Sequence, residues 1–154
     1  GLIVSFHWPQ AGNHVNSNNT SCVVSISDGH YRILLPGDIE REAEYALIKT
    51  TQLPSANVLI APHHGSKTSS TQAFITSVSP QYVIYTQGYE NRWQFPSKKV
   101  YQRYEAFGSR QFTTSEFGYI RLEFSSKGII VEPTRSGSTK RWFMVNKPPR
   151  YLQD

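Results

Sequence analysis

The sequence predicts an α/β fold in which helices flank a mixed β-sheet. Short apolar runs rich in β-branched and aromatic residues alternate with segments whose apolar residues recur at helical spacing. The expected order of elements is β-β-β-α-β-α-β-α-β-β, which is typical of layered α/β architectures. With 154 residues, of which 38% are hydrophobic, the chain can bury one sizeable core. We therefore expect a single folded domain.

The predicted strands are short runs bounded by glycine, proline, aspartate or serine. They comprise residues 2–6, 20–27, 31–35, 57–60, 82–86, 117–124 and 128–132. The Asp-Gly-His sequence at residues 28–30 is a tight-turn signal, so the second and third strands should form a hairpin. Residues 125–127 should join the last two strands in the same way.

Three helices are predicted to connect the strands. The first begins near Ile39 with Asp38 as its candidate N-cap, and Pro54 stops it. Glutamates in its first turns complement the helix dipole. The second covers residues 71–78, and the third runs from a cap at Ser97 through residue 107. Each helix follows one strand and precedes another, as a crossover connection requires.

Composition excludes several classes of protein. No apolar run approaches the roughly 20 residues of a membrane-spanning helix. The chain has one cysteine, Cys22, which excludes an internal disulfide and a thiolate zinc cluster. Cys22 lies in a strand-like run, where a buried, inert thiol is expected. The chain opens on an apolar run without an initiator methionine, which indicates a piece of a longer protein.

The distribution of charge divides the chain into two parts. Residues 1–132 are predicted to form the folded domain, and residues 133–154 a basic, partly ordered C-terminal tail. The formal net charge is +5, and many of the cations after residue 97 are interleaved with tyrosine and tryptophan. That pattern suits a nucleic-acid backbone and stacked bases. A solvated basic face is the alternative interpretation.

Two adjacent histidines mark the candidate site. His63 and His64 follow the predicted strand at residues 57–60 directly, within the sequence Pro-His-His-Gly-Ser. Neighbouring residues of an extended chain point in opposite directions, so we expect one imidazole to bind a metal and the other either to support the metal ligands or to contact substrate. Gly65 permits a tight turn, and the backbone N–H groups at Gly65 and Ser66 can face an anion.

Two further loops should converge on the histidines. Asp38 follows one apolar strand and is a helix cap, or a metal ligand or base, and its two oxygens allow both roles together. Asn91 and Arg92 follow another strand and could hydrogen-bond a phosphate, as could the hydroxyl of Ser66. In α/β folds, loops that leave the carboxyl ends of strands carry the chemistry. Imidazole and carboxylate together suit zinc or manganese.

The ordered motifs resemble a known family. They are residues 19–24 (Asn-Thr-Ser-Cys-Val-Val), 34–40 (Leu-Leu-Pro-Gly-Asp-Ile-Glu), 62–66 with Ser69-Ser70, 88–92 (Gly-Tyr-Glu-Asn-Arg), Phe95-Pro96, and Thr113-Thr114 before Gly118. Together, over roughly residues 1–132, they resemble the C-terminal metallo-β-lactamase-like domain of the ComEC competence proteins. Those proteins are multi-pass channels of the bacterial inner membrane that import single-stranded DNA.

The resemblance implies an αβ/βα sandwich with a two-metal site that cleaves phosphodiesters, degrading the strand that is not imported. Asp38 would be the bridging metal ligand, and the histidine pair would supply one more. We favour His63, the first residue after the strand, although His64 stays open. Asp38, His63 and His64 are thus the candidate catalytic residues. Ser66, Asn91 and Arg92 are the candidate substrate contacts.

Two departures from the family pattern limit this interpretation. The His-x-His-x-Asp-His motif that supplies most metal ligands is absent, so the chain resembles only the second half of the domain. Phe95 stands where many relatives have histidine. We therefore expect the chain alone to be inactive, to pair with itself through exposed core edges, and to need no small-molecule cofactor. The alternatives are a non-catalytic DNA-binding or scaffolding domain, and part of a soluble metallo-hydrolase.

Overall fold

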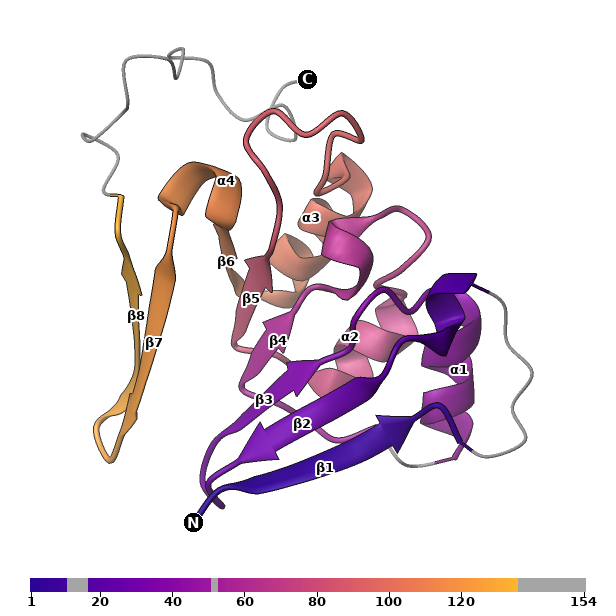
Figure 1. Ribbon diagram of the computed structural model, residues 1–154, viewed down its shortest axis with the longest axis horizontal. Helices are drawn as coiled ribbons and strands as arrows, with labels where there is room; N and C mark the ends of the chain where they lie inside the picture. Colours follow the sequence, from indigo (N-terminus) through magenta and orange to yellow (C-terminus); the bar gives the residue numbers. More distant parts are fainter. Residues whose placement is uncertain (11–16, 51–52, 136–154) are drawn as a thin grey trace.

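A computed structural model describes residues 1–10, 17–50 and 53–135, and it has the α/β architecture expected from the sequence (Figure 1). Its strands are β1 (Ile3–Trp8), β2 (Val23–Ser27), β3 (Arg32–Leu35), β4 (Val58–Ile60), β5 (Tyr82–Tyr85), β6 (Arg110–Thr113), β7 (Ile120–Ser125) and β8 (Gly128–Pro133). Its helices are α1 (Arg41–Lys49), α2 (Gln72–Val78), α3 (Lys98–Phe107) and α4 (Thr114–Phe117), with 3₁₀ turns η1 (Ser17–Thr20) and η2 (Pro62–Gly65). No helix in these described ranges is both long and apolar enough to span a lipid bilayer.

Six strands form one mixed sheet in the order β1-β2-β3-β4-β5-β6. The first three strands pair antiparallel, whereas β3 to β6 pair parallel. Helices α1, α2 and α3 make the crossovers between successive parallel strands (Figure 1). The carboxyl ends of β3, β4 and β5 therefore lie side by side at one edge of the sheet, as the loop pattern predicted.

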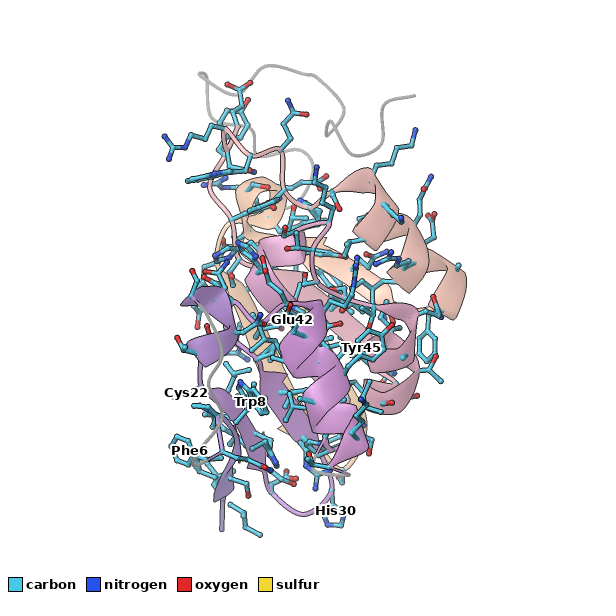
Figure 2. All side chains as sticks on the ribbon, turned by 90° about the vertical axis from the view of Figure 1, so that its right-hand side faces the viewer. Phe6, Trp8, Cys22, His30, Glu42 and Tyr45 are labelled. Atoms are coloured by element: carbon cyan, nitrogen blue, oxygen red, sulfur yellow. The ribbon has the colours of Figure 1, made fainter. Side chains whose placement is uncertain are left out.

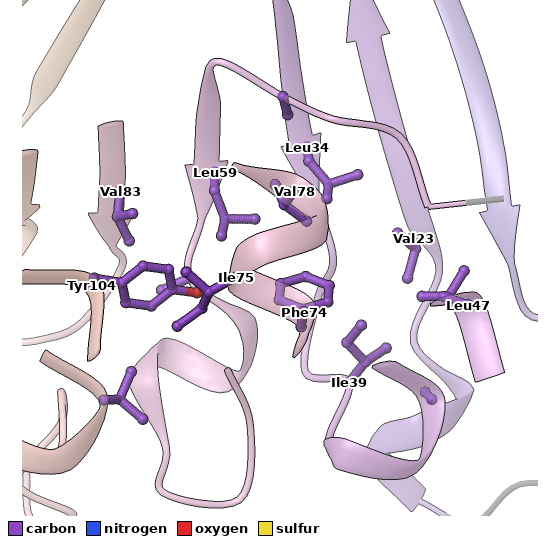
Figure 3. Packing of buried hydrophobic residues seen from close by; sticks show 14 of the residues in the cluster. Val23, Leu34, Ile39, Leu47, Leu59, Phe74, Ile75, Val78, Val83 and Tyr104 are labelled. Carbon is purple, nitrogen blue, oxygen red and sulfur yellow. The ribbon is translucent and has the colours of Figure 1, made fainter. Parts of the chain in front are cut away.

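The helices bury one face of this sheet in a continuous apolar core. Leu34 and Leu59 from the central strands are fully buried against Phe74 of α2 and Leu47 of α1 (Figure 3). Tyr104 of α3 closes the same core on the β5 side. Each such apolar side chain contributes roughly 1.5–3 kcal/mol when it leaves water. This packing fixes the strand ends, and with them the loops that carry polar side chains.

The β7–β8 hairpin covers part of the opposite face. A second cluster forms where Tyr82 and Ile84 of β5 meet apolar residues of the hairpin, such as Leu122. The hairpin does not cover the β1 edge of the sheet, where Val4 and Phe6 are 56% and 74% exposed. Figure 2 shows Phe6 projecting away from the outer side of the sheet. One face of the sheet is thus closed, and the other is only partly covered.

The first helix differs from the prediction. It begins at Arg41, its N-cap position is Glu40, and no side chain accepts a capping hydrogen bond there. Asp38 is therefore not the cap. Ile39 is fully buried in the core instead of starting the helix. Burial of Ile39 holds residues 38–40 in a non-helical segment, which leaves Asp38 available for other contacts.

Two further expectations are corrected. Cys22 is exposed rather than buried, because β2 begins only at Val23 and Cys22 precedes its pleated ladder (Figure 2). Strand β6 was not predicted, since its sequence Arg-Gln-Phe-Thr has a single large apolar residue, Phe112. The segment nevertheless forms strand β6, because it pairs parallel with β5. The last hairpin is confirmed, although β7 begins at Ile120.

The predicted tail lies mostly outside the described residues. Only its first part is described, and there Thr134 and Arg135 donate backbone N–H bonds to the carbonyls of Tyr119 and Phe117. Residues 136–154 are not described. The boundary proposed at residue 132 stays a prediction.

Candidate functional site

The histidine turn η2 has an unusual backbone. His63 and His64 both have left-handed dihedral angles, with φ of 47° and 54°. Consecutive left-handed residues other than glycine cost roughly 1–2 kcal/mol each, so the surroundings must hold them. The N–H of His63 donates to the carbonyl of Gly37 at 3.0 Å, which ties the turn to the loop after β3. Gly65 packs so closely that a Cβ would lie 2.7 Å from the ring of Tyr85.

This backbone brings both imidazoles to one side. Their rings lie 5.7 Å (His63) and 6.4 Å (His64) from the centroid of Phe95, so both face the loop after β5. The expectation that they point in opposite directions is wrong, because it assumed an extended chain. Packing of the turn, rather than strand alternation, decides where the two rings lie.

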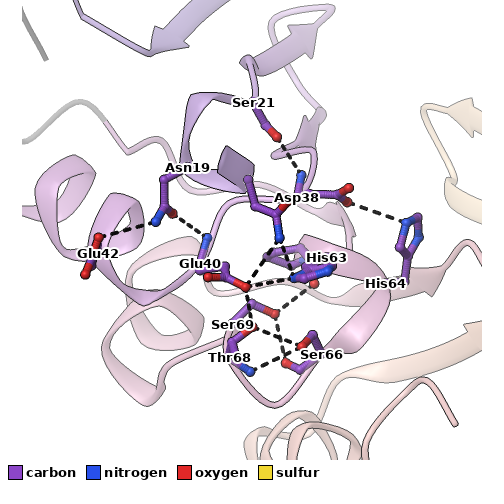
Figure 4. Close-up of polar contacts among 12 residues, drawn as sticks. Asn19, Ser21, Asp38, Glu40, Glu42, His63, His64, Ser66, Thr68 and Ser69 are labelled. Atoms are coloured by element: carbon purple, nitrogen blue, oxygen red, sulfur yellow. Dashed lines mark hydrogen bonds and ion pairs between the residues drawn. The ribbon is translucent and has the colours of Figure 1, made fainter. Parts of the chain in front are cut away.

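His64 is paired with Asp38 at the edge of the sheet (Figure 4). Its Nε2 lies 3.5 Å from Oδ1 of Asp38, and the two side chains are 42% and 44% exposed. Its Nδ1 lies 3.2 Å from the hydroxyl of Thr86, at the end of β5. Side chains from three successive strand ends therefore meet at one point, open to solvent.

His63 belongs to a second, less exposed set of contacts (Figure 4). Its Nδ1 lies 3.1 Å from Oε1 of Glu40, which also accepts a hydrogen bond from the hydroxyl of Thr68 at 2.7 Å. The Thr68 hydroxyl does most to hold the pKa of Glu40 below its ordinary value, with Asn18 and His63 acting in the same direction. Because a carboxylate only accepts hydrogen bonds, Nδ1 of His63 carries the proton and a neutral ring presents a lone pair at Nε2.

Glu40 is a residue of the candidate site that the sequence analysis does not single out. Its place before α1 predicts only an interaction with the helix dipole, whereas in the structure its carboxylate contacts His63. A signal was present in the sequence Asp38-Ile39-Glu40, where an isoleucine that is buried in the core separates two carboxylates. The side chain of Asn19 fixes this segment by accepting the N–H of Glu40 at 2.8 Å.

The three predicted substrate contacts have different positions. Ser66 is only 5% exposed, and its hydroxyl lies 3.0 Å from that of Thr68. The side-chain amide of Asn91 makes hydrogen bonds within its own loop: it donates to the carbonyl of Phe95 and accepts from the N–H of Phe95. Arg92 is exposed and lies over the ring of Trp93. Only Arg92 of these three presents its polar group to solvent.

The Asp38–His64 pair has the chemistry of a partial metal site. When Nδ1 of a neutral His64 donates to Thr86, its Nε2 lone pair faces the carboxylate of Asp38, and a proton or cation between them relieves the repulsion. Zinc bonds of about 2.0–2.2 Å in a tetrahedral site place two ligand atoms about 3.4 Å apart. The observed 3.5 Å fits that spacing. Within the described ranges, however, no group of three or more metal-ligating side chains comes together.

Comparison with known proteins shows several relatives of the chain, although no protein-family model matches it. An uncharacterized protein of Escherichia coli, YcaI, is 38% identical over 144 residues, which cover 93% of this chain. Competence protein ComA of Neisseria gonorrhoeae is 29% identical over 136 residues, covering 88% of this chain. Competence proteins are among its homologues.

Recombination protein 2 of Haemophilus influenzae is a third relative, 33% identical over 119 residues that cover 77% of this chain. The matched region is a small part of each relative: 19% of YcaI, 20% of the competence protein and 15% of recombination protein 2. The chain thus spans a fifth or less of the length of the relatives it matches. The aligned part includes, for YcaI and the competence protein, most of the fold described above.

Proposed function

We propose that this chain is part of a bacterial DNA-uptake protein and contributes to a metal-dependent phosphodiesterase site. The observation that carries the proposal is the Asp38–His64 pair at the edge where parallel strands end. Homology to competence protein ComA supports the DNA-uptake context. DNA and the membrane channel of a longer, multi-pass protein of the inner membrane are then its partners.

Asp38 and His64 would hold a divalent zinc or manganese ion, which supplies Lewis-acid polarisation of a phosphoryl oxygen and a nucleophilic water. Geometry favours His64 as the ligand that shares an ion with Asp38, since its Nε2 lies 3.5 Å from Oδ1 of that carboxylate. His63 would then accept or hold a proton at Nε2, oriented by the carboxylate of Glu40. Two ligands are too few for such an ion, so water and other side chains of the longer protein would complete its coordination.

A metallo-β-lactamase-like αβ/βα sandwich is the finer fold that we propose. Helices on one face of the mixed sheet and a partly open opposite face agree with one half of such a sandwich, which consists of a sheet and its helix layer.

A second copy of the chain could cover the exposed β1 edge, where Val4 and Phe6 lie. Light scattering of the purified chain should then give the mass of a dimer that Phe6→Ser returns to a monomer. A monomeric wild-type chain would refute this pairing.

Transformation frequency tests the metal role. Asp38→Asn, placed in the gene that encodes this chain, should lower transformation by about 100-fold or more, since metal catalysis contributes several kcal/mol to the rate. The matched control is Glu42→Gln, an exposed carboxylate on α1. Titration calorimetry measures zinc binding by the purified chain, and the affinity should weaken with Asp38→Asn and with His64→Ala. Unchanged transformation in a normally folded Asp38→Asn variant would refute the catalytic role.

A second candidate is a DNA-binding or scaffolding domain without chemistry. The absence of a three-ligand cluster among the described residues favours it. This candidate predicts normal transformation with Asp38→Asn and reduced transformation when exposed cations such as Arg92 are neutralised. The two variants together therefore separate the candidates.

A further inference from the structure

The loop between β5 and α3 presents aromatic rings to solvent. Trp93 is 61% exposed and Tyr89 is 40% exposed, and neither belongs to the two apolar core clusters. Trp93 stacks on Phe95, with ring centroids 6.2 Å apart and an interplanar angle of 12°. Trp93 therefore keeps a large part of its ring in water while it packs nearly parallel to Phe95.

The stack continues into the site. Phe95 stacks in turn with His64, at 6.4 Å between centroids and 24° between ring planes. We call Trp93, Phe95 and His64 the aromatic ladder. It leads from the exposed tip of the loop to the ring that faces Asp38.

The ladder is pre-ordered by the loop itself. Asn91 brackets Phe95 with hydrogen bonds of 2.9 Å and 2.8 Å, and the N–H of Gln94 donates to the carbonyl of Asn91 at 3.0 Å. The position of Phe95 is therefore fixed before any ligand arrives. A ring that is already in place loses little conformational entropy when another ring stacks on it.

Positive charge accompanies the ladder. The guanidinium carbon of Arg92 lies 4.3 Å from the centroid of the Trp93 ring. Lys99 is exposed at the start of α3, directly after the loop, and Lys67 is exposed after the histidine turn. A flat aromatic face combined with cations fits a ligand that carries both a ring and a phosphate.

We propose that Trp93 and the Arg92 guanidinium form a stacking platform for an unpaired base of single-stranded DNA, which passes along the aromatic ladder to Asp38 and His64. Bases in a duplex have both faces stacked on neighbours, so only an unpaired base can use the platform. The identity of the polymer rests on the proposed function, whereas the stacking itself rests on the geometry of Trp93, Phe95 and Arg92.

Fluorescence anisotropy of labelled oligo(dT), in EDTA, tests the platform on the purified chain. Trp93→Ala should weaken binding by about 5-fold to 100-fold, while Trp93→Phe should retain most of the affinity. Tyr119→Ala is the matched control, because Tyr119 is 70% exposed and lies outside the ladder. An abasic strand, which keeps the phosphates but lacks bases, should bind weakly and equally to the wild type and to Trp93→Ala.

Three outcomes overturn the platform. One is a Trp93→Ala variant that binds as tightly as Tyr119→Ala. Another is an equal loss of affinity on the abasic strand, and the third is a duplex bound as tightly as the single strand. EDTA makes the assay independent of metal, so the two proposals fail separately. Normal oligo(dT) affinity in Trp93→Ala refutes only the platform, and normal transformation in Asp38→Asn refutes only the catalytic role.

Discussion

Glu44 and Asp38 lie six residues apart and have opposite environments. Glu44 of α1 is fully buried, and its carboxylate accepts the backbone N–H bonds of Ser70 and Thr71 where α2 begins. The Asp38 side chain is 44% exposed, and within the described ranges its polar partner is the His64 ring, 3.5 Å away. One carboxylate joins two helices, while the other is open to solvent. Burial with backbone hydrogen bonds gives Glu44 a structural role, whereas the exposure of Asp38 leaves it accessible to an ion or a substrate.

The largest effect should come from removing the buried member of this comparison. Glu44→Ala leaves two buried N–H groups without acceptors, which should lower the free energy of unfolding by roughly 2–5 kcal/mol. Urea denaturation measures the loss. Glu42→Ala, an exposed residue on the same helix, is the control and should change stability by less than about 0.5 kcal/mol. Equal stability of the two variants would show that Glu44 does not join α1 to α2.

The same carboxylate should give a specific pH dependence. Burial raises the pKa of Glu44 above its ordinary value, while the N–H groups of Thr71 and Ser70 and the charge of Arg103 oppose that rise. A raised folded-state pKa means that the folded state binds the proton more tightly. The resulting stabilisation is complete below the ordinary glutamate pKa of about 4.3 and is lost as pH rises through the folded pKa.

Urea denaturation of the wild type and of Glu44→Gln between acid and neutral pH checks this sign. The stability of the wild type relative to Glu44→Gln should be highest at acid pH and should fall as the pH rises. A difference that grows with pH would mean that the ionised carboxylate is the more stable form in the folded state.

The smallest effect on folding is expected at the exposed member. Asp38→Asn should change the free energy of unfolding by less than about 0.5 kcal/mol, because Asp38 caps no helix and its side chain is half exposed. Thermal denaturation of both proteins measures the difference. A loss near 1 kcal/mol would instead match a helix cap and would remove the contrast with Glu44.

The positions of most strands and helices along the chain could be predicted from local patterns. Alternating apolar runs and helix-stop residues located three helices and seven of the strands, and the placement of Asp38, His63 and His64 after strands predicted that their loops would meet. Strand β6 escaped because its formation depends on pairing with β5 rather than on its own composition. The proposed roles of the site residues, the metal and the partners stay predictions.

By itself, then, the sequence determined seven of the described strands, the helices α1 to α3 and the loops in which the polar residues lie, because these depend on periodicity and turn chemistry within a few residues. Only the tertiary structure decided which side chains meet. Close packing of Gly65 against Tyr85 accompanies a left-handed backbone at His63 and His64 that turns both rings toward Phe95. Glu40 gains its significance from His63 and Thr68, which are distant in sequence, and such contacts are fixed by three-dimensional packing.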